Sequence, residues 1–283
     1  MYKEFYGLTR SPFDITPDPS FIVLTPQHNE AFANLYCGLR WQKGIVVLTG
    51  EAGTGKTLLI RCLLKAMAES SIEFAYLMNT NVSAEQLLEC VALDFGIGIA
   101  GKTKAALLDD FQTFLISRHI SGLTTALVID EAHNLSVEAL EEIRLLTNLE
   151  TSQLKLLQVL LVGQPDLDRA LDSPHLWHLK QRVALRCGLG PLSCEEVKSY
   201  IEQRLEVAGA NGRVHSLFPA ATSRLIHRYS GGIPRIVNVL CDNALIAGYS
   251  RHCESIHTEI IEEIAGDLRL AETSAVSREQ TIA

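Results

Sequence analysis

The feature that most constrains the fold is the segment Gly50-Glu-Ala-Gly-Thr-Gly-Lys-Thr57, which matches the pattern G-x-x-x-x-G-K-[ST]. A β-branched run at 45–49 precedes it, and a helical pattern at 56–69 follows it. The glycines let successive backbone N–H groups turn toward phosphate oxygens at the positive end of the new helix. The segment therefore predicts a strand, a phosphate-binding loop and a helix in that order, and a chance glycine-rich turn is the alternative.

ATP and Mg²⁺ are the ligands that this loop predicts. Lys56 would neutralise charge on the β- and γ-phosphates, and the Thr57 hydroxyl would bind Mg²⁺. We expect contacts to the nucleotide from the whole segment and the residue after it, namely Gly50, Glu51, Ala52, Gly53, Thr54, Gly55, Lys56, Thr57 and Leu58.

A second motif lies where the apolar run at 126–129 ends in Asp130 and Glu131. A carboxylate at the end of a buried strand can hold Mg²⁺, and the adjacent Glu131 can act as a base that polarises a water in line with the γ-phosphate. Strands also end in acidic residues for solubility alone, which is the alternative interpretation. Beside a phosphate-binding loop, the Asp-Glu pair favours hydrolysis over simple nucleotide binding.

Two polar residues follow or precede the later strands of the core. Gln164 comes directly after the strand predicted to end at 163, where an amide can sense the γ-phosphate; capping the helix that starts at Pro165 is its alternative role. Arg182 precedes the last predicted strand, where an arginine finger would reach the nucleotide of a neighbouring subunit. A surface charge beside Arg186 is the alternative for Arg182.

Arg235 stands in the run Gly231-Gly-Ile-Pro-Arg235 and opens a helix in the C-terminal part of the chain. There it could contact the γ-phosphate of its own subunit, or instead pair with an acid such as Asp242. Asn79, at the end of a predicted strand, is a weaker candidate for holding Glu131 in an inactive orientation.

The order of elements predicts a doubly wound, parallel five-stranded α/β sheet followed by an all-helical module. Continuous apolar strands alternate with helices up to about 188, and only helices follow. We expect a leader and helix at 1–43 packing on the nucleotide site, an α/β core at 44–190, a helical lid at 191–266 and a disordered tail at 267–283. The predicted strands are 45–49, 73–79, 124–130, 155–163 and 183–187. The predicted lid helices are 194–209, 219–229 and 234–250.

Composition excludes several classes of protein. The 283 residues are 47% hydrophobic and 20% charged, which is ordinary for a globular chain. No apolar run reaches the ~18 to 20 residues that a membrane span needs, so we expect no membrane span and a cytoplasmic location. Seven scattered cysteines predict neither a disulfide framework nor a zinc site. The net charge of −8 argues against a wholly basic nucleic-acid binder, although residues 182–251 carry a net +4.

Further motifs give the chain a resemblance to a known family. An α/β core followed by a helical lid with Gly-x-Pro-Arg resembles the AAA+ ATPases and, more narrowly, the ExeA-type ATPases associated with bacterial secretion. Asp130-Glu-Ala-His133 also spells a helicase signature, but Gln181-Arg182-Val-Ala-Leu-Arg186 lacks the glycine and second arginine of that class. The ExeA-type resemblance rests on Tyr6-Gly-Leu, Pro12-Phe13, Thr16-Pro-Asp-Pro19, the phosphate-binding loop, Ile129-Asp-Glu-Ala132, residues 140–150 and 156–165, and Gly232-Ile-Pro-Arg-Ile-Val-Asn238.

The resemblance implies a homo-oligomeric ring or filament that hydrolyses ATP to assemble or remodel a partner complex of unknown identity. Secretion, exopolysaccharide and transposition machineries are the contexts that it implies. His133 stands where the family usually has glutamine, which should be tolerated. Phe13 is expected to cover the adenine or, alternatively, to pack in a core. The rival function is an ATP-gated scaffold or double-stranded DNA-binding regulator whose hydrolysis is slow.

Overall fold

The computed structural model describes residues 1–68, 71–78, 80–151, 154–210, 212 and 214–272. It divides the chain into two compact units. A sheet unit contains residues 26–51 and 59–189, and a helical unit contains residues 1–25, 52–58 and those from 190 onward. Most of the tail predicted at 267–283 lies outside the described residues, and so does Asn79.

The sheet unit is built on five parallel strands in the order β2-β3-β4-β1-β5, which confirms the predicted fold class. The register pairs Val47 with Leu161 across β1 and β4, and Leu127 with Val159 across β3 and β4. The strands are β1 (Ile45–Gly50), β2 (Ile72–Leu77), β3 (Thr124–Ile129), β4 (Leu157–Gly163) and β5 (Val183–Leu189).

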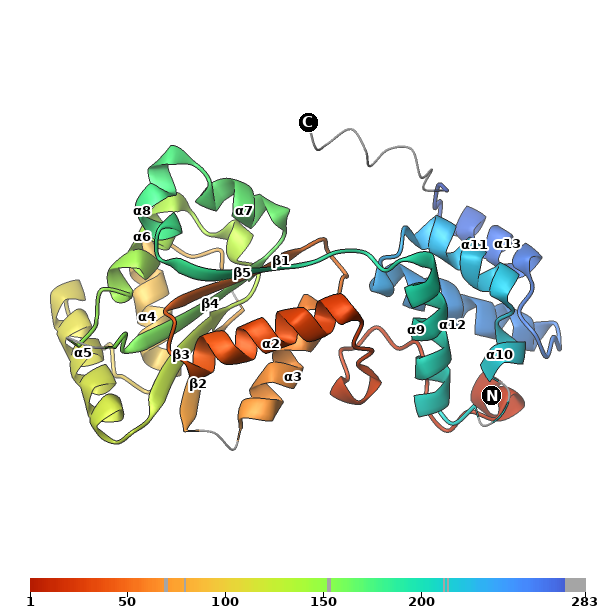
Figure 1. Ribbon diagram of the computed structural model, residues 1–283, viewed down its shortest axis with the longest axis horizontal. Helices are drawn as coiled ribbons and strands as arrows, with labels where there is room; N and C mark the ends of the chain where they lie inside the picture. Colours follow the sequence, from red (N-terminus) through yellow and green to blue (C-terminus); the bar gives the residue numbers. More distant parts are fainter. Residues whose placement is uncertain (69–70, 79, 152–153, 211, 213, 273–283) are drawn as a thin grey trace. The chain divides into compact units, whose positions relative to one another are not determined.

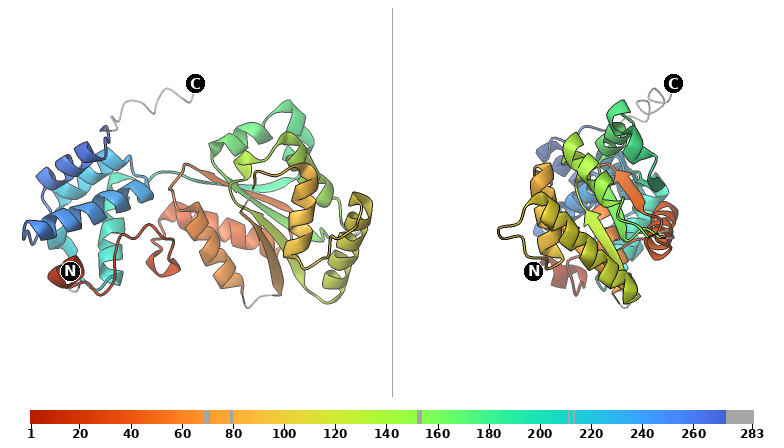
Figure 2. Two further views of the ribbon diagram at one scale, coloured as in Figure 1. Left: turned by 180° about the vertical axis from the view of Figure 1, so that it is seen from behind. Right: turned by 90° about the vertical axis from the view of Figure 1, so that its left-hand side faces the viewer.

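Helices cover both faces of this sheet because its central strands are apolar on both sides. On one face, β1 residues Ile45 and Val47 share a buried cluster with α4 (Ala84–Asp94), α5 (Lys104–Ile120) and α6 (Val137–Leu146). On the other face, α2 (Pro26–Arg40) packs so closely that a Cβ at Gly38 would lie 2.7 Å from Val46 Cγ2. In Figure 1, α2 runs in front of the sheet, and the view from behind in Figure 2 shows α4 and α5 in front of it.

Local signals account for where the helices of this unit begin. Pro26 is the first residue of α2, and Ser83 forms a capping box with Gln86 at the start of α4. Helix α5, whose N-cap Thr103 accepts a hydrogen bond from the Ala106 N–H, was not predicted. The remaining helices are α3 (Lys56–Met67), which starts in residues 52–58, α7 (Pro165–Leu171) and α8 (Trp177–Lys180), with short 3₁₀ turns at Ala132–Asn134 and Pro174–Leu176.

The helical unit has its own buried apolar core, to which the leader contributes. Phe13 is 1% exposed and meets Phe218 edge-on, with the ring centroids 5.9 Å apart. Tyr6 donates a hydrogen bond to the Cys253 carbonyl. The lid-region helices are α9 (Cys194–Val207), α10 (Val214–Leu217), α11 (Ala220–Ser230), α12 (Pro234–Ser250) and α13 (Thr258–Asp267), and α1 (Tyr2–Tyr6) and the 3₁₀ turn Pro19–Phe21 belong to the leader.

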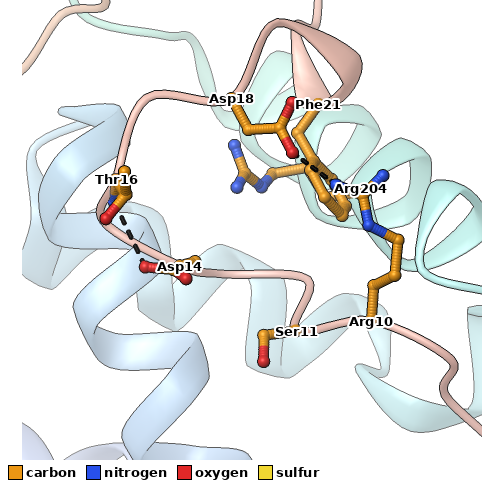
Figure 3. Close-up of a pocket in the computed structure, with 7 residues that line it drawn as sticks. All are labelled: Arg10, Ser11, Asp14, Thr16, Asp18, Phe21 and Arg204. Carbon is orange, nitrogen blue, oxygen red and sulfur yellow. Dashed lines mark hydrogen bonds and ion pairs between the residues drawn. The ribbon is translucent and has the colours of Figure 1, made fainter.

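Arg204 on α9 ties the leader to the helical core (Figure 3). Its side chain is buried; Nε donates to the Pro12 carbonyl at 2.6 Å, and the guanidinium lies 5.0 Å from the centroid of the Phe21 ring. Arg10, which also lies over Phe21, pairs with Asp18 across a small pocket of about 230 Å³. These contacts explain why residues 1–25 group with the helical unit.

The structure therefore divides the leader differently from our expectation of a single segment at 1–43. Residues 1–25 are held by apolar and polar contacts within the helical unit, whereas α2 packs on β1 and β5 of the sheet unit. The division falls at the proline that opens α2. At the other end of the sheet unit, the chain passes into the helical unit between Leu189 and Gly190.

Candidate functional site

Three polar residues leave the sheet at the same edge. Glu51 follows β1, Asp130 follows β3 and Gln164 follows β4. Because these strands are parallel and adjacent through β4, their carboxyl ends meet along one edge. Open α/β sheets bind ligands at this edge.

Asp130 is held by hydrogen bonds on both of its carboxylate oxygens. Oδ1 accepts the Glu131 N–H at 3.0 Å, and Oδ2 accepts the hydroxyl of Tyr76 from β2 at 2.9 Å. The Asp130 N–H in turn donates to the Leu77 carbonyl, which extends the β2–β3 pairing past the last residue of β3. Burial and the Asp130 carboxylate raise the pKa of Tyr76 above its ordinary value, so its hydroxyl remains a donor.

Glu131 has a backbone conformation that L-residues rarely adopt. Its φ of 55° and ψ of 35° place it in the left-handed region, which costs a non-glycine residue about 1 kcal/mol or more. Its carbonyl accepts hydrogen bonds from Thr80 Oγ1 at 3.1 Å and from the Asn134 N–H at 3.0 Å. These contacts stabilise the turn, and the Glu131 side chain stays nearly half exposed.

His133 connects the ends of β3 and β4. Its Nδ1 accepts the Gln164 N–H at 3.3 Å and lies 3.4 Å from Glu131 Oε2. Gln164 occupies the N-cap position of α7, but its side chain makes no capping hydrogen bond; its carbonyl instead accepts the Leu167 N–H. The capping alternative for the Gln164 amide is therefore wrong, and the amide is not used in starting α7.

The central part of the phosphate-binding loop, residues 52–58, groups with the helical unit. Gly53 and Gly55 have φ values of +85° and +100°, which only glycine adopts without strain. Thr54 and Lys56 are buried. The loop therefore has the backbone turns that a phosphate-binding loop requires.

Arg235 lies against this loop in the first turn of α12. Its N–H donates to the Gly53 carbonyl at 3.2 Å, and a Cβ on Gly53 would lie 2.8 Å from the Cβ of Arg235. The Arg235 side chain is exposed, and among the described residues of its unit it forms no ion pair. Asp242, its alternative partner, instead accepts a hydrogen bond from the Tyr2 hydroxyl.

The family follows from comparison with known proteins. Residues 40–171 match the family described as AAA domain. The chain is 40% identical over 284 aligned residues to General secretion pathway protein A of Aeromonas hydrophila, an alignment that covers 99% of this chain and 50% of that protein. The ORC2 protein of Aeropyrum pernix, in ADPNP-ADP complexes, superposes with a TM-score of 0.68 at 17% identity, covering 94% of this chain and 73% of that one. The chain contains an AAA domain and has the AAA+ fold.

This AAA+ chain spans only half the length of its secretion-pathway relative. It is also 33% identical over 102 residues to the Mu-like prophage FluMu DNA transposition protein B of Haemophilus influenzae, an alignment covering 36% of this chain and 33% of that protein. The family supports nucleotide-triphosphatase chemistry in general. In the part of the chain that the structure describes, no helix is both long and apolar enough to cross a membrane.

The predicted arginine finger is bound within its own sheet unit. Arg182 Nη1 donates to the Thr147 hydroxyl at 3.2 Å and to the Arg144 carbonyl at 3.4 Å, so it satisfies a carbonyl in the last turn of α6. Arg186, on β5, lies 3.3 Å from carboxylate oxygens of Asp168 and Asp172. Arg182 therefore makes specific contacts to α6 and the residue after it, in addition to lying near Arg186 as a surface charge would.

The available donors suit magnesium. Asp130 and Thr57 offer a carboxylate and a hydroxyl, the hard oxygen ligands that Mg²⁺ prefers. Within the described ranges, no group of three or more His, Cys, Asp or Glu side chains could hold a metal ion. Mg²⁺ is commonly held by one or two protein ligands, phosphates and waters rather than by a protein cage, so a carboxylate and a hydroxyl are each suitable ligands.

Sequence reasoning missed three residues near the Asp-Glu pair and misjudged one elsewhere. Tyr76 and Thr80 come from β2 and the segment after it, and nothing in their local sequence indicates a partner more than 50 residues away. His133 was considered only as a tolerated replacement for the glutamine usual in the family. Phe13 is buried in the core of the helical unit, so this geometry supports packing and contradicts a role over the adenine.

Proposed function

We propose that this AAA+ protein hydrolyses ATP with Mg²⁺ and that turnover drives assembly or remodelling of a partner complex. The observation that carries the proposal is the end of β3, where Asp130 is fixed on both oxygens while the Glu131 side chain stays accessible. A fixed carboxylate suits ion binding. A solvent-accessible carboxylate next to it suits the activation of water.

The residues of the chain divide the work of hydrolysis. Lys56 and the loop N–H groups bind the phosphates, and Glu131 takes the proton of the attacking water. Gln164 and Arg235 sense the γ-phosphate, and Arg235 is supported by its contact with Gly53. A bound magnesium ion would neutralise phosphate charge, with Thr57 and, through water, Asp130 as its protein ligands.

A homo-oligomer, as a ring or filament, completes this proposal. Arg182 of one subunit would stabilise the charge that develops at the nucleotide of the next. In the single subunit its guanidinium is engaged by two hydrogen bonds longer than 3 Å, so reaching a neighbour requires that they break. The protein partner that the assembly would remodel is of unknown identity; the similarity to a general secretion pathway protein supports secretion machinery as one context.

The test of hydrolysis compares two variants with two matched controls. Glu131→Gln keeps the shape but removes the base, so ATP binding should persist while turnover falls by ~10² or more. Lys56→Ala should weaken ATP binding itself. Glu89→Gln, on the exposed face of α4, and Lys65→Ala, in the last turn of α3, should leave binding and turnover near those of the unaltered protein.

Phosphate release and equilibrium binding of a fluorescent ATP analogue provide the two measurements. Turnover by Glu131→Gln at the unaltered rate would exclude Glu131 as the base. Unchanged affinity in Lys56→Ala would exclude the phosphate-binding loop.

A second function is an ATP-gated scaffold or regulator that binds double-stranded DNA and hydrolyses ATP slowly. The similarity to a DNA transposition protein and the net +4 of residues 182–251 support it. Measuring turnover and oligomer size with and without double-stranded DNA distinguishes the two functions. ATP-dependent assembly on DNA with little turnover would favour the scaffold.

A further inference from the structure

The hydroxyl of Tyr76 is placed where it can control the geometry of the proposed magnesium site. Tyr76 lies on β2, pairs in register with Val128 of β3, and donates to Asp130 Oδ2 at 2.9 Å. Both residues belong to the sheet unit, and the β2–β3 pairing continues to the Asp130 N–H. The pairing of β2 with β3 therefore positions both partners of this hydrogen bond.

The two hydrogen bonds on Asp130 act together. The Glu131 N–H reaches Oδ1 and the Tyr76 hydroxyl reaches Oδ2, so rotation of the carboxylate would break both. A carboxylate oxygen can accept more than one hydrogen bond, so these two contacts orient Asp130 without using up its capacity as an acceptor. A phenylalanine at position 76 would fill the same space but leave Oδ2 without this donor.

The Tyr76 hydroxyl acts as the donor in its contact with Asp130, because a carboxylate oxygen accepts hydrogen bonds. Tyr76 is an uncharged side chain. It supplies a hydrogen bond without adding a charge that would compete with a cation.

We propose that Tyr76 is a positioning residue, which orients Asp130 toward Mg²⁺ in the ATP-bound protein. This inference rests on the proposed function, because it assumes a nucleotide whose binding depends on magnesium. Groups that orient a metal ligand typically change metal affinity by 10- to 100-fold when they are removed. Loss of the Tyr76 hydroxyl should therefore raise the Mg²⁺ concentration that nucleotide binding needs. It should not change the nucleotide affinity measured without Mg²⁺.

The experiment titrates Mg²⁺ against binding of a fluorescent ATP analogue to the full chain. Tyr76→Phe should bind the analogue in EDTA within twofold of the unaltered protein, but should need ~10-fold more Mg²⁺ for half-maximal response. Tyr6→Phe is the matched control, because it removes a hydroxyl that donates to the Cys253 carbonyl instead of to a site carboxylate. Its magnesium dependence should be unchanged.

A double-mutant cycle separates positioning from a general loss of packing. In an Asp130→Asn background, Tyr76→Phe should no longer shift the magnesium response, because Tyr76 acts through the carboxylate. The proposal for Tyr76 is overturned if Tyr76→Phe shifts the Mg²⁺ concentration for half-maximal response equally in both backgrounds, or if Tyr76→Phe alone causes no shift. Either result leaves the proposed Mg²⁺-dependent ATP binding of the unaltered protein standing. If the unaltered protein binds the analogue with no dependence on Mg²⁺, the proposed function and the role of Tyr76 both fail.

Discussion

The end of β3 and the start of α12 both present charged side chains, but they hold them in opposite ways. Asp130 is 6% exposed and both of its oxygens accept hydrogen bonds, and Glu131 is confined to a left-handed turn. At Arg235 the backbone is fixed by Pro234 and by the bond to Gly53, whereas the side chain is exposed. One region fixes its side chain and the other fixes only the backbone.

This difference matches two tasks in nucleotide hydrolysis. A metal ligand works best when the folded protein has already oriented it, because no reorganisation is then needed during the reaction. A sensor must change its contacts when the γ-phosphate is present, so an exposed side chain on a fixed backbone suits it. Arg182 is intermediate, since its guanidinium is engaged by two long hydrogen bonds.

The largest expected effect comes from Arg182, which tests whether this intermediate residue acts in a neighbouring subunit. Arg182→Ala should reduce hydrolysis by ~10³ or more, as loss of an arginine finger does, with little change in ATP affinity. Mixing Arg182→Ala with Glu131→Gln should restore part of the activity, because some interfaces then pair an intact Glu131 with an intact Arg182. Phosphate release from the mixture is the measurement.

A control variant and a stability measurement accompany this prediction. Arg186→Ala, on the same strand, removes a guanidinium that pairs with Asp168 and Asp172, and it should leave hydrolysis within a few-fold of the unaltered protein. Thermal unfolding should show that Arg182→Ala remains folded after losing its contacts to α6. If the mixture stays inactive, Arg182 does not act in trans.

A second, smaller effect is expected on ATP affinity when a substitution at Gly53 creates a steric clash with Arg235. Gly53→Ala adds a Cβ that would lie 2.8 Å from Arg235 Cβ at a φ of +85°, so the loop must shift. Strain of about 2 kcal/mol corresponds to about a 30-fold weaker ATP affinity if the shifted loop binds phosphate poorly. Equilibrium binding measures the loss.

Gly98→Ala is the control for this substitution, because a Cβ there meets no atom within 4 Å and the φ of Gly98 is not in the left-handed region. Its ATP affinity should equal that of the unaltered protein. If Gly53→Ala bound ATP as tightly as the unaltered protein, ATP binding would not require the close approach of the loop to Arg235.

The smallest effect should come from His133, which connects the fixed carboxylate region with Gln164. His133→Ala leaves the Gln164 N–H without its acceptor, which at about 1–3 kcal/mol should lower turnover by about tenfold. His133→Gln supplies an amide oxygen as a replacement acceptor and should stay within about threefold of the unaltered rate. An equal loss in both variants would show that the acceptor at position 133 is unimportant.

Contiguous sequence was enough to predict the core of the fold and most strand positions. The predicted strands at 45–49 and 124–130 correspond to β1 and β3 within one residue at each end, and the lid helix at 234–250 corresponds to α12. Among the longer helices, α5 and α13 were not predicted. The amphipathic pattern of α5 is weaker than those of the helices that follow Ser83 and Ser193, and α13 starts after His257 without a side-chain capping hydrogen bond.

By itself, the sequence determined where a phosphate-binding loop and an Asp-Glu pair occur, because both depend on residues within one strand–turn segment. Only the tertiary structure decided that Tyr76 donates to Asp130, that Arg182 contacts Thr147 and that Phe13 packs on Phe218. Each of these contacts joins residues at least 35 positions apart, and their side chains could have packed elsewhere without changing any local pattern. Burial and hydrogen bonding select one arrangement only once the sheet and the helical core bring the distant segments together.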